Sequence, residues 1–101
     1  MLFCESYFRK GVFIVRVSGN LNNDTIYIFK KEITSIIKYF EIKKAIFNLS
    51  DLNIDNDGLN IIINNCNIVK NNGGDVRFCG IDSNILKPSF HNEYEALSSF
   101  N

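Results

Sequence analysis

The sequence predicts an α/β fold in which a mixed sheet of about four strands is packed by two main helices and a short C-terminal helix. Two observations lead to this prediction. Stretches with the two-residue apolar alternation of strands are separated by stretches with the three- and four-residue spacing of helices. Their order is strand, strand, helix, strand, helix, strand, helix, which is typical of a mixed sheet covered by helices. The 101 residues can bury one hydrophobic core, so we expect a single domain over residues 1–101.

A β-hairpin is expected at the N-terminus. Residues 2–8 (LFCESYF) and 12–18 (VFIVRVS) have the composition of strands. In the second stretch, Phe13, Val15 and Val17 alternate with Ile14 and Arg16. Gly11 lies between the two stretches and is suited to a tight turn, so the pair is predicted to be antiparallel.

A first helix is expected from about Thr25, after a polar loop over residues 19–24. Asp24 or Thr25 is a residue type that favours the N-cap position. The segment carries one apolar stripe, formed by Ile26, Phe29, Ile33, Ile36, Ile37 and Phe40. The opposite side carries Lys30, Lys31, Thr34 and Lys38. We therefore expect the stripe to be buried and the opposite side to be exposed.

The remaining elements are a third strand, a second helix, a fourth strand and a short final helix, expected at residues 43–50, 59–70, 75–81 and 93–100. Residues 45–49 form an almost continuous apolar run, as in a buried strand. Gly73 or Gly74 can take the left-handed conformation that ends a helix. The only proline, Pro88, falls in the tail before the final helix.

Two isoleucines of the second helix, Ile61 and Ile68, are expected on its exposed side. Helical spacing places them among Asn64 and Asn65, roughly opposite the apolar face of the helix. That apolar face consists of Leu59, Ile62, Ile63, Cys66 and Val69. Isolated exposed isoleucines are common on ordinary protein surfaces, but they can also belong to a partner-binding face.

Composition argues against several classes of function. Eleven basic and eleven acidic residues give a net charge of zero, which removes the usual electrostatic reason to expect a nucleic acid or an anionic membrane as partner. No apolar run approaches the roughly 18 residues needed to span a bilayer, and the N-terminus lacks the pattern of an export signal. Cys4, Cys66 and Cys79 have no metal-like spacing and are expected to be reduced thiols. We expect a cytoplasmic protein without membrane insertion.

No motif of a catalytic or metal site is present in the sequence. His91 is the only histidine and is expected on the surface, and neither a nucleophile elbow nor a glycine-rich phosphate loop occurs. Asp51, Asp55 and Asp57 resemble part of a calcium loop, but Asn64 stands where such a loop needs a glutamate. We therefore expect a protein that is not an enzyme and has no cofactor and no metal.

The stretch NIDNDGLNIII, residues 53–63, places two aspartates and a glycine directly before an apolar helical run. The start of a helix has free backbone N–H groups and the positive end of the helix dipole, and both favour an oxygen acceptor. Asp55 is suited to the N-cap position and Asp57 to the first turn. Taken alone, this arrangement is that of an ordinary helix start.

Three strings, in this order, resemble a STAS domain of the bacterial anti-sigma-factor antagonists. The strings are VSGNLNNDT at 17–25, AIFNLSDLNIDNDGLNIII at 45–63 and VKNNGGDVRFCGI at 69–81. The first string is similar to the family's G-E-L-D loop. The second is similar to its strand, D-S-S-G loop and following helix. The third is similar to the end of that helix, a G-G turn and the next strand. The resemblance implies a STAS-like fold. The tail is shorter than the family pattern, so we expect a chain shortened after the fourth strand, without the third helix.

The resemblance also implies a non-enzymatic regulatory module of sporulation or stress signalling that controls transcription. In the family, a partner kinase, the anti-sigma factor, phosphorylates the second serine of D-S-S-G, and the unphosphorylated form captures that kinase. Asp57 stands at the position of that serine and Asn56 at the position before it. The phosphate acceptor is therefore missing, and the fixed charge of Asp57 partly imitates the phosphorylated state. Asn20 and Asn22 also replace the Glu and Asp of the first loop.

We expect a protein partner, an anti-sigma-factor kinase or a related regulator, and a homodimer is possible. The expected partner surface consists of Asn22, Asn23, Asp55, Asn56, Asp57, Gly58, Ile61 and Ile68. Two alternatives fit the same resemblance. One is a STAS accessory subunit that docks on the ATPase of a lipid-transporting ABC system, and the other is a diverged domain that only associates with itself.

Overall fold

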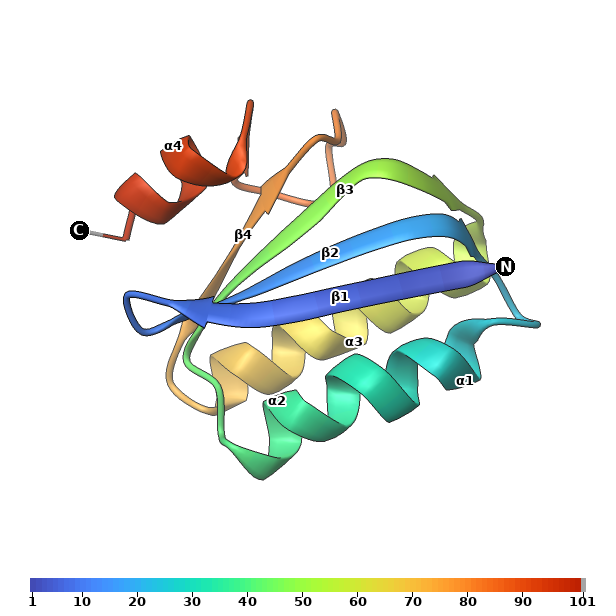
Figure 1. The fold of residues 1–101 in the computed structure, drawn as a ribbon, viewed down its shortest axis with the longest axis horizontal. Helices are drawn as coiled ribbons and strands as arrows, with labels where there is room; N and C mark the ends of the chain where they lie inside the picture. The colour runs from blue at the N-terminus through green and yellow to red at the C-terminus, as the bar shows by residue number, and fades with distance from the viewer. Residues whose placement is uncertain (101) are drawn as a thin grey trace.

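The computed structural model describes residues 1–100, and its elements follow the predicted order (Figure 1). The strands are β1 (Leu2–Arg9), β2 (Val12–Leu21), β3 (Lys44–Ile54), β4 (Asp75–Cys79) and β5 (Ser89–Phe90). The helices are α1 (Ile26–Phe29), η1 (Lys30–Thr34), α2 (Ser35–Tyr39), α3 (Asn56–Asn71) and α4 (Glu93–Ser98). The strands form one sheet in the order β1-β2-β3-β4-β5, antiparallel between β1 and β2 and parallel elsewhere. The predicted mixed α/β sheet is therefore confirmed.

The hairpin at the N-terminus turns at the predicted place. Lys10 and Gly11 have φ angles of 54° and 79°, and positive φ at both central residues is typical of the two-residue turns of β-hairpins. Both β2 and β3 run further than the sequence indicated, to Leu21 and Ile54, and these two residues are partners in the parallel register. Backbone pairing on the sheet overrides the polar composition of the two strand ends.

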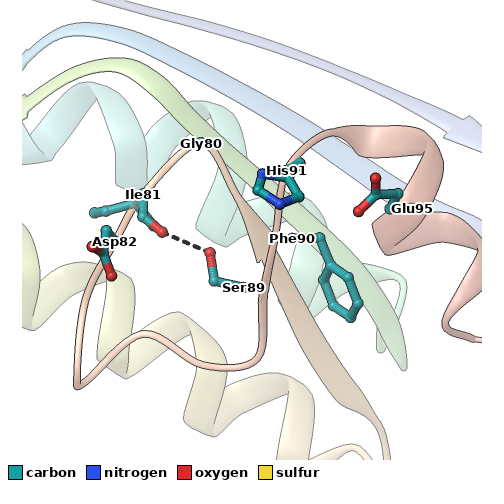
Figure 2. Close-up of a pocket in the computed structure, with 7 residues that line it drawn as sticks. All are labelled: Gly80, Ile81, Asp82, Ser89, Phe90, His91 and Glu95. Carbon is teal, nitrogen blue, oxygen red and sulfur yellow. Dashed lines mark hydrogen bonds between the residues drawn. The ribbon is translucent and has the colours of Figure 1, made fainter.

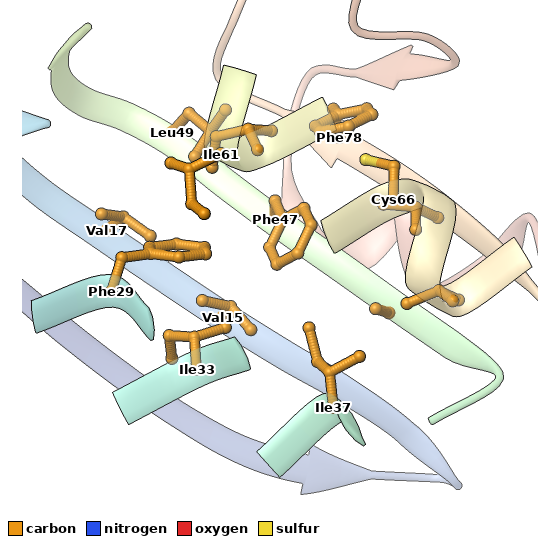
Figure 3. Close-up of a cluster of buried hydrophobic side chains, with 14 of the residues drawn as sticks. Val15, Val17, Phe29, Ile33, Ile37, Phe47, Leu49, Ile61, Cys66 and Phe78 are labelled. Carbon is orange, nitrogen blue, oxygen red and sulfur yellow. The ribbon is translucent and has the colours of Figure 1, made fainter. Parts of the chain in front are cut away.

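The larger core lies between the sheet and the layer formed by α1, η1, α2 and α3. Its side chains include Val15, Val17, Phe29, Ile33, Ile37, Phe47, Leu49, Ile61, Cys66 and Phe78 (Figure 3). The segments α1, η1 and α2 follow one another without a break and form one helical run. Phe29, Ile33 and Ile37 are at most 1% exposed, as their helical spacing predicts.

Two predictions for this first helical run are wrong. Phe40, expected in the buried stripe, is 60% exposed, because the helix ends at Tyr39 and the Phe40 ring lies against Phe8, with ring centroids 6.4 Å apart. Thr34, expected on the exposed side, is buried. It belongs to η1, a π-helical turn that is wider than an α-helical turn, and such a turn interrupts the regular spacing on which the prediction depends.

The prediction that Ile61 lies on an exposed face of α3 is also wrong. Ile61 is only 6% exposed, Asn65 is fully buried and Ile68 is half-buried. Figure 1 shows the reason, because α2 lies alongside α3 on the same face of the sheet. The sheet covers one side of α3 and the neighbouring helix covers part of another, so α3 has a wider buried surface than its main apolar stripe suggests.

A smaller core lies on the opposite face of the sheet, under α4. It consists of Val12, Ile14, Ile46, Cys79, Ala96 and Leu97. The final helix was predicted over residues 93–100 and is found at Glu93–Ser98. Residues 80–88, between β4 and β5, contain no helix, and the short strand β5 that follows them was not predicted. The sheet therefore has five strands rather than about four.

Candidate functional site

The carboxyl ends of β2 and β3 bring two loops together at one edge of the sheet. The strands are parallel neighbours, and the backbone N–H of Asp55 donates to the Leu21 carbonyl at 3.3 Å. The start of α1 and the start of α3 consequently lie at the same end of the molecule, near the N-terminus (Figure 1). The structure thus places the first loop and the acidic stretch side by side.

The first of these loops, residues 22–25, is held by its own side chains. The Asn22 Oδ1 accepts from the backbone N–H of Asp24 at 2.9 Å, and the Asn22 N–H donates to the Thr25 Oγ1 at 3.0 Å. The Thr25 hydroxyl donates back to the Asn20 carbonyl at 2.7 Å. Thr25 occupies the N-cap position of α1, one of the two predicted, but its side chain stabilises the loop rather than the helix. Asn23 is exposed.

The second loop is the start of α3, and its cap is the predicted one. The Asp55 carboxylate accepts from the Gly58 N–H at 2.8 Å, as an N-cap residue does. Asn56 and Asp57 follow in the first turn and are exposed. Within residues 1–100, the Asp57 carboxylate takes part in no hydrogen bond or ion pair. Its negative charge therefore faces solvent at the positive end of a sixteen-residue helix.

Gly58 holds these two loops close to each other and is not itself exposed. A Cβ atom at this position would lie 2.2 Å from the Leu21 carbonyl oxygen and 2.9 Å from Cγ1 of Ile54. Only glycine allows the first turn of α3 to approach the end of β2 this closely. Gly58 was predicted as part of the partner surface, but the structure buries it and gives it a packing role.

The structure separates the predicted site residues into two groups. Asn22, Asn23, Asp55, Asn56 and Asp57 lie together at the carboxyl ends of β2 and β3, and we call them the loop surface. Ile61 and Ile68 lie further along α3 with their side chains against the core and α2, so they do not extend the loop surface. The candidate site is therefore smaller and more polar than the sequence indicated.

The family model of the STAS domain matches residues 4–92 of the chain. The chain belongs to the STAS domain family. This confirms the resemblance that the three strings indicated. A curated relative, the anti-sigma F factor antagonist of Paenibacillus polymyxa, is 24% identical over 106 residues and covers 93% of this chain and 91% of its own.

Two solved structures show the same fold. An anti-sigma factor antagonist from Mycobacterium paratuberculosis superposes with a TM-score of 0.81 at 15% identity, covering 98% of this chain and 93% of its own. The phosphorylated form of the Bacillus cell fate determinant SpoIIAA gives a TM-score of 0.76 at 12% identity, covering 98% of this chain and 100% of its own. These likenesses establish the arrangement of strands and helices.

A pocket of about 560 Å³ lies beside β4 and β5, apart from the loop surface. Figure 2 shows its lining residues, Gly80, Ile81, Asp82, Ser89, Phe90, His91 and Glu95. The Ser89 hydroxyl donates to the Ile81 carbonyl at 2.6 Å, so its proton is directed at a backbone acceptor instead of a base. His91 is exposed, as predicted. The pocket lacks the pairing of nucleophile and base that covalent catalysis needs.

The cysteines and the acidic residues give no sign of other chemistry in the described part of the chain. Burial raises the pKa of the Cys4, Cys66 and Cys79 thiols to about 11, so all three are uncharged near neutral pH and are weak nucleophiles. No cluster of three or more His, Cys, Asp or Glu residues among residues 1–100 could hold a metal ion. None of the helices described is long and apolar enough to cross a bilayer.

One charged cluster of this STAS domain was missed by the sequence analysis. It joins strands β1, β2 and β3 to α4, and its Arg16 donates to Glu93 twice, from Nε at 2.7 Å and from Nη2 at 2.9 Å. Tyr7 and Asn48 donate to the same carboxylate at 3.1 Å and 2.7 Å. These bonds, that from Arg16 foremost, hold the pKa of Glu93 down to about 2 although partial burial acts in the opposite direction.

The signal for this cluster was present in the hairpin. Arg16 interrupts an apolar strand, and such a position indicates a second sheet face that is only partly covered. Its partner Glu93 lies 77 residues further along the chain, so the sequence alone does not show which carboxylate Arg16 meets.

Proposed function

We propose that this STAS domain is a non-enzymatic regulatory module of the anti-sigma-factor-antagonist type that binds a protein partner through the loop surface. Asp57 supplies a permanent charge at the position that matches the phosphorylated serine of the family. The observation that carries the proposal is the isolation of this carboxylate. It is exposed in the first turn of α3 and has no internal bond among the residues described, so the fold does not need its charge.

The charge of Asp57 is expected to act on the docking of the partner. A phosphoserine carries roughly −1.5 to −2 charges near neutral pH, whereas an aspartate carries one, so Asp57 gives the loop surface part of the charge of a phosphorylated relative at all times. In the family, the unphosphorylated form captures the kinase. The carboxylate should therefore weaken, without abolishing, the binding of such a partner.

The solved structures of relatives support an effect on the surface rather than on the fold. This chain superposes on the unphosphorylated form of SpoIIAA with a TM-score of 0.77 and on the phosphorylated form with a TM-score of 0.76. The same arrangement of strands and helices thus accompanies both charge states. A carboxylate at this position is expected to leave the fold intact and to change only what the loop surface presents.

A phosphorylation assay tests whether position 57 corresponds to a serine that an anti-sigma-factor kinase phosphorylates. Wild type, Asp57→Ser and Asp57→Ala are each incubated with the anti-sigma factor of the source organism and ATP, and intact masses are recorded. We expect one added phosphate on Asp57→Ser and none on the other two, because only the serine variant has a hydroxyl at the first turn of α3. The proposal would be contradicted if Asp57→Ser stayed unmodified while the same kinase phosphorylated another antagonist that has the serine.

A further inference from the structure

The connection between β4 and β5, residues 80–88, joins two parallel strands without a helix. Connections between parallel neighbours usually have a dozen or more residues and contain an α-helix that covers the sheet. Here an irregular loop makes the crossing (Figure 2). The loop passes over the face of the sheet that carries α3, because its Leu86 belongs to the same core as Cys66 and Phe78. This end of the sheet is therefore covered by a loop where a helix is usual.

A pocket of about 110 Å³ lies between α3, β4 and this loop. Its apolar lining consists of Ile63 and Cys66 from α3, Val76 and Phe78 from β4, and Leu86 from the loop. Figure 3 shows Cys66 and Phe78 next to each other in the larger core. A further lining residue, Ile85, is 61% exposed. The apolar lining thus continues from the core to the surface, and it is suited to an apolar group that enters from outside.

The size of the pocket restricts what that group can be. Pockets for small-molecule ligands usually have volumes of about 300–1,000 Å³, so this pocket is too small for most of them. An apolar cavity of about 150 Å³ takes up a single benzene molecule, which is close to the size of one large aliphatic side chain. At protein interfaces, single side chains that fill such pockets supply much of the binding energy. The pocket is therefore suited to one anchoring side chain of a partner.

The charges at the pocket indicate what surrounds that side chain in the partner. Lys70 and Lys87 line the pocket and are exposed, and no carboxylate of residues 1–100 lines it. Within the same residues neither lysine forms an ion pair. Burial raises the pKa of the Cys66 thiol, and the charge of Lys70 acts in the opposite direction. The surroundings of the pocket are thus positive and complementary to acidic residues.

We propose that this pocket receives a leucine side chain, or one of similar shape, from a partner protein in which acidic residues flank it. The aliphatic group lies against Ile63, Val76 and Leu86, and the flanking carboxylates pair with Lys70 and Lys87. The pocket lies along the second half of α3, whereas the loop surface lies at the start of this helix. The inference therefore does not depend on the function proposed for Asp57.

Three capped peptides test the assignment on the methyl-labelled full chain by NMR titration. Asp-Glu-Leu-Glu-Asp has the anchor and the charges, Asp-Glu-Ala-Glu-Asp lacks the anchor, and Lys-Lys-Leu-Lys-Lys has the opposite charge. We expect the first to shift the methyl signals of Ile63 and Leu86 in a saturable way and the other two to bind about tenfold more weakly. Absence of shifts with the first peptide, or equal affinity for all three, would overturn the proposal.

A fourth probe distinguishes a protein partner from a small molecule. The 4-methylpentanoate ion has the same branched aliphatic group and one carboxylate but no peptide chain. We expect it to bind about tenfold more weakly than Asp-Glu-Leu-Glu-Asp, because it can pair with only one of the two lysines at a time. Equal or tighter binding of 4-methylpentanoate would contradict a protein partner and would assign the pocket to small carboxylates.

A reversal of charge locates the binding. The double variant Lys70→Glu, Lys87→Glu should keep the fold, since both side chains are exposed. It should bind Asp-Glu-Leu-Glu-Asp at least about tenfold more weakly than wild type and Lys-Lys-Leu-Lys-Lys more tightly. The control is Lys31→Glu, Lys38→Glu, which changes the net charge equally at two exposed residues that do not line the pocket. An unchanged preference in the first variant, or the same change in the control, would show that the peptides do not occupy this pocket.

Discussion

The starts of α3 and α4 share one local design and serve different purposes. Each begins with an Asx N-cap whose side chain accepts from the backbone N–H three residues on, Asp55 from Gly58 at 2.8 Å and Asn92 from Glu95 at 2.9 Å. Each carries a carboxylate in its first turn, Asp57 in α3 and Glu93 in α4. The difference lies in what surrounds these two carboxylates.

Glu93 is enclosed by donors from three strands of the sheet. Arg16, Tyr7 and Asn48 donate to it, and its side chain is only 17% exposed. It fixes α4 to the face of the sheet that has the smaller apolar core. Asp57 has no such neighbour in the described chain. A carboxylate at a helix start is thus structural when donors converge on it, and it is available to a partner when they do not.

The largest effect is expected at the third residue of the helix, where the two starts differ most. Gly58→Ala should lower the free energy of unfolding by about 3 kcal/mol, because the added Cβ would lie 2.2 Å from the Leu21 carbonyl oxygen. Glu95→Ala, at the matching position of α4, should change it by about 0.5 kcal/mol or less, since Glu95 is exposed. Urea denaturation measures both. Similar losses for the two variants would contradict the close approach of α3 to β2.

The first-turn carboxylates give the next contrast. Glu93→Gln should lower the free energy of unfolding at neutral pH by about 2 kcal/mol, less than the full change in pKa implies because the side chain of its partner Arg16 is 46% exposed to solvent. Asp57→Asn should lower it by about 0.5 kcal/mol, the loss of a favourable interaction with the helix dipole. The same denaturation measurement applies. If Asp57→Asn were the more destabilising of the two, the division of roles would be wrong.

The stabilising effect of Glu93 should depend on pH in one direction. Its pKa is about 2 in the folded protein against an ordinary value of 4.5, so its contribution is complete above about pH 4.5 and is lost as the pH falls toward 2. The difference in unfolding free energy between wild type and Glu93→Gln should therefore shrink over this range. Denaturation curves at several pH values test it, and a difference that stays constant down to pH 2.5 would show that the carboxylate is not held ionised by Arg16.

The sequence predicts the structural features that depend on residues close together in the chain. The hairpin turn at Gly11, the cap at Asp55 and the end of α3 at Gly73, where φ is +94°, are local features and were predicted. The burial of Ile61 was not, because it depends on α2 lying alongside α3. Nor was the pairing of Arg16 with Glu93, 77 residues away. Helical periodicity also assumes a uniform helix, and the π-helical turn at Thr34 breaks that assumption.

The candidate site shows the same difference between features that follow from the sequence and features that depend on packing. The loop surface follows from adjacent parallel strands, so residues near the ends of β2 and β3 were placed together correctly. Gly58 was assigned to the surface because it belongs to the acidic string, but its close contact with Leu21 is a property of the packed structure. Position in a family motif therefore indicates where a site lies, and only the packing shows which of its residues a partner can reach.

The most direct test of the central claim is the affinity for the anti-sigma factor of the source organism, measured by isothermal titration calorimetry. Wild type, Asp57→Asn and the control Glu95→Gln, which removes one exposed charge from α4, are compared at the same ionic strength. We expect Asp57→Asn to bind about tenfold more tightly than wild type, because the charge that imitates a phosphate is gone, and Glu95→Gln to bind as wild type does. Equal affinity of wild type and Asp57→Asn, or weaker binding by Asp57→Asn, would contradict the account.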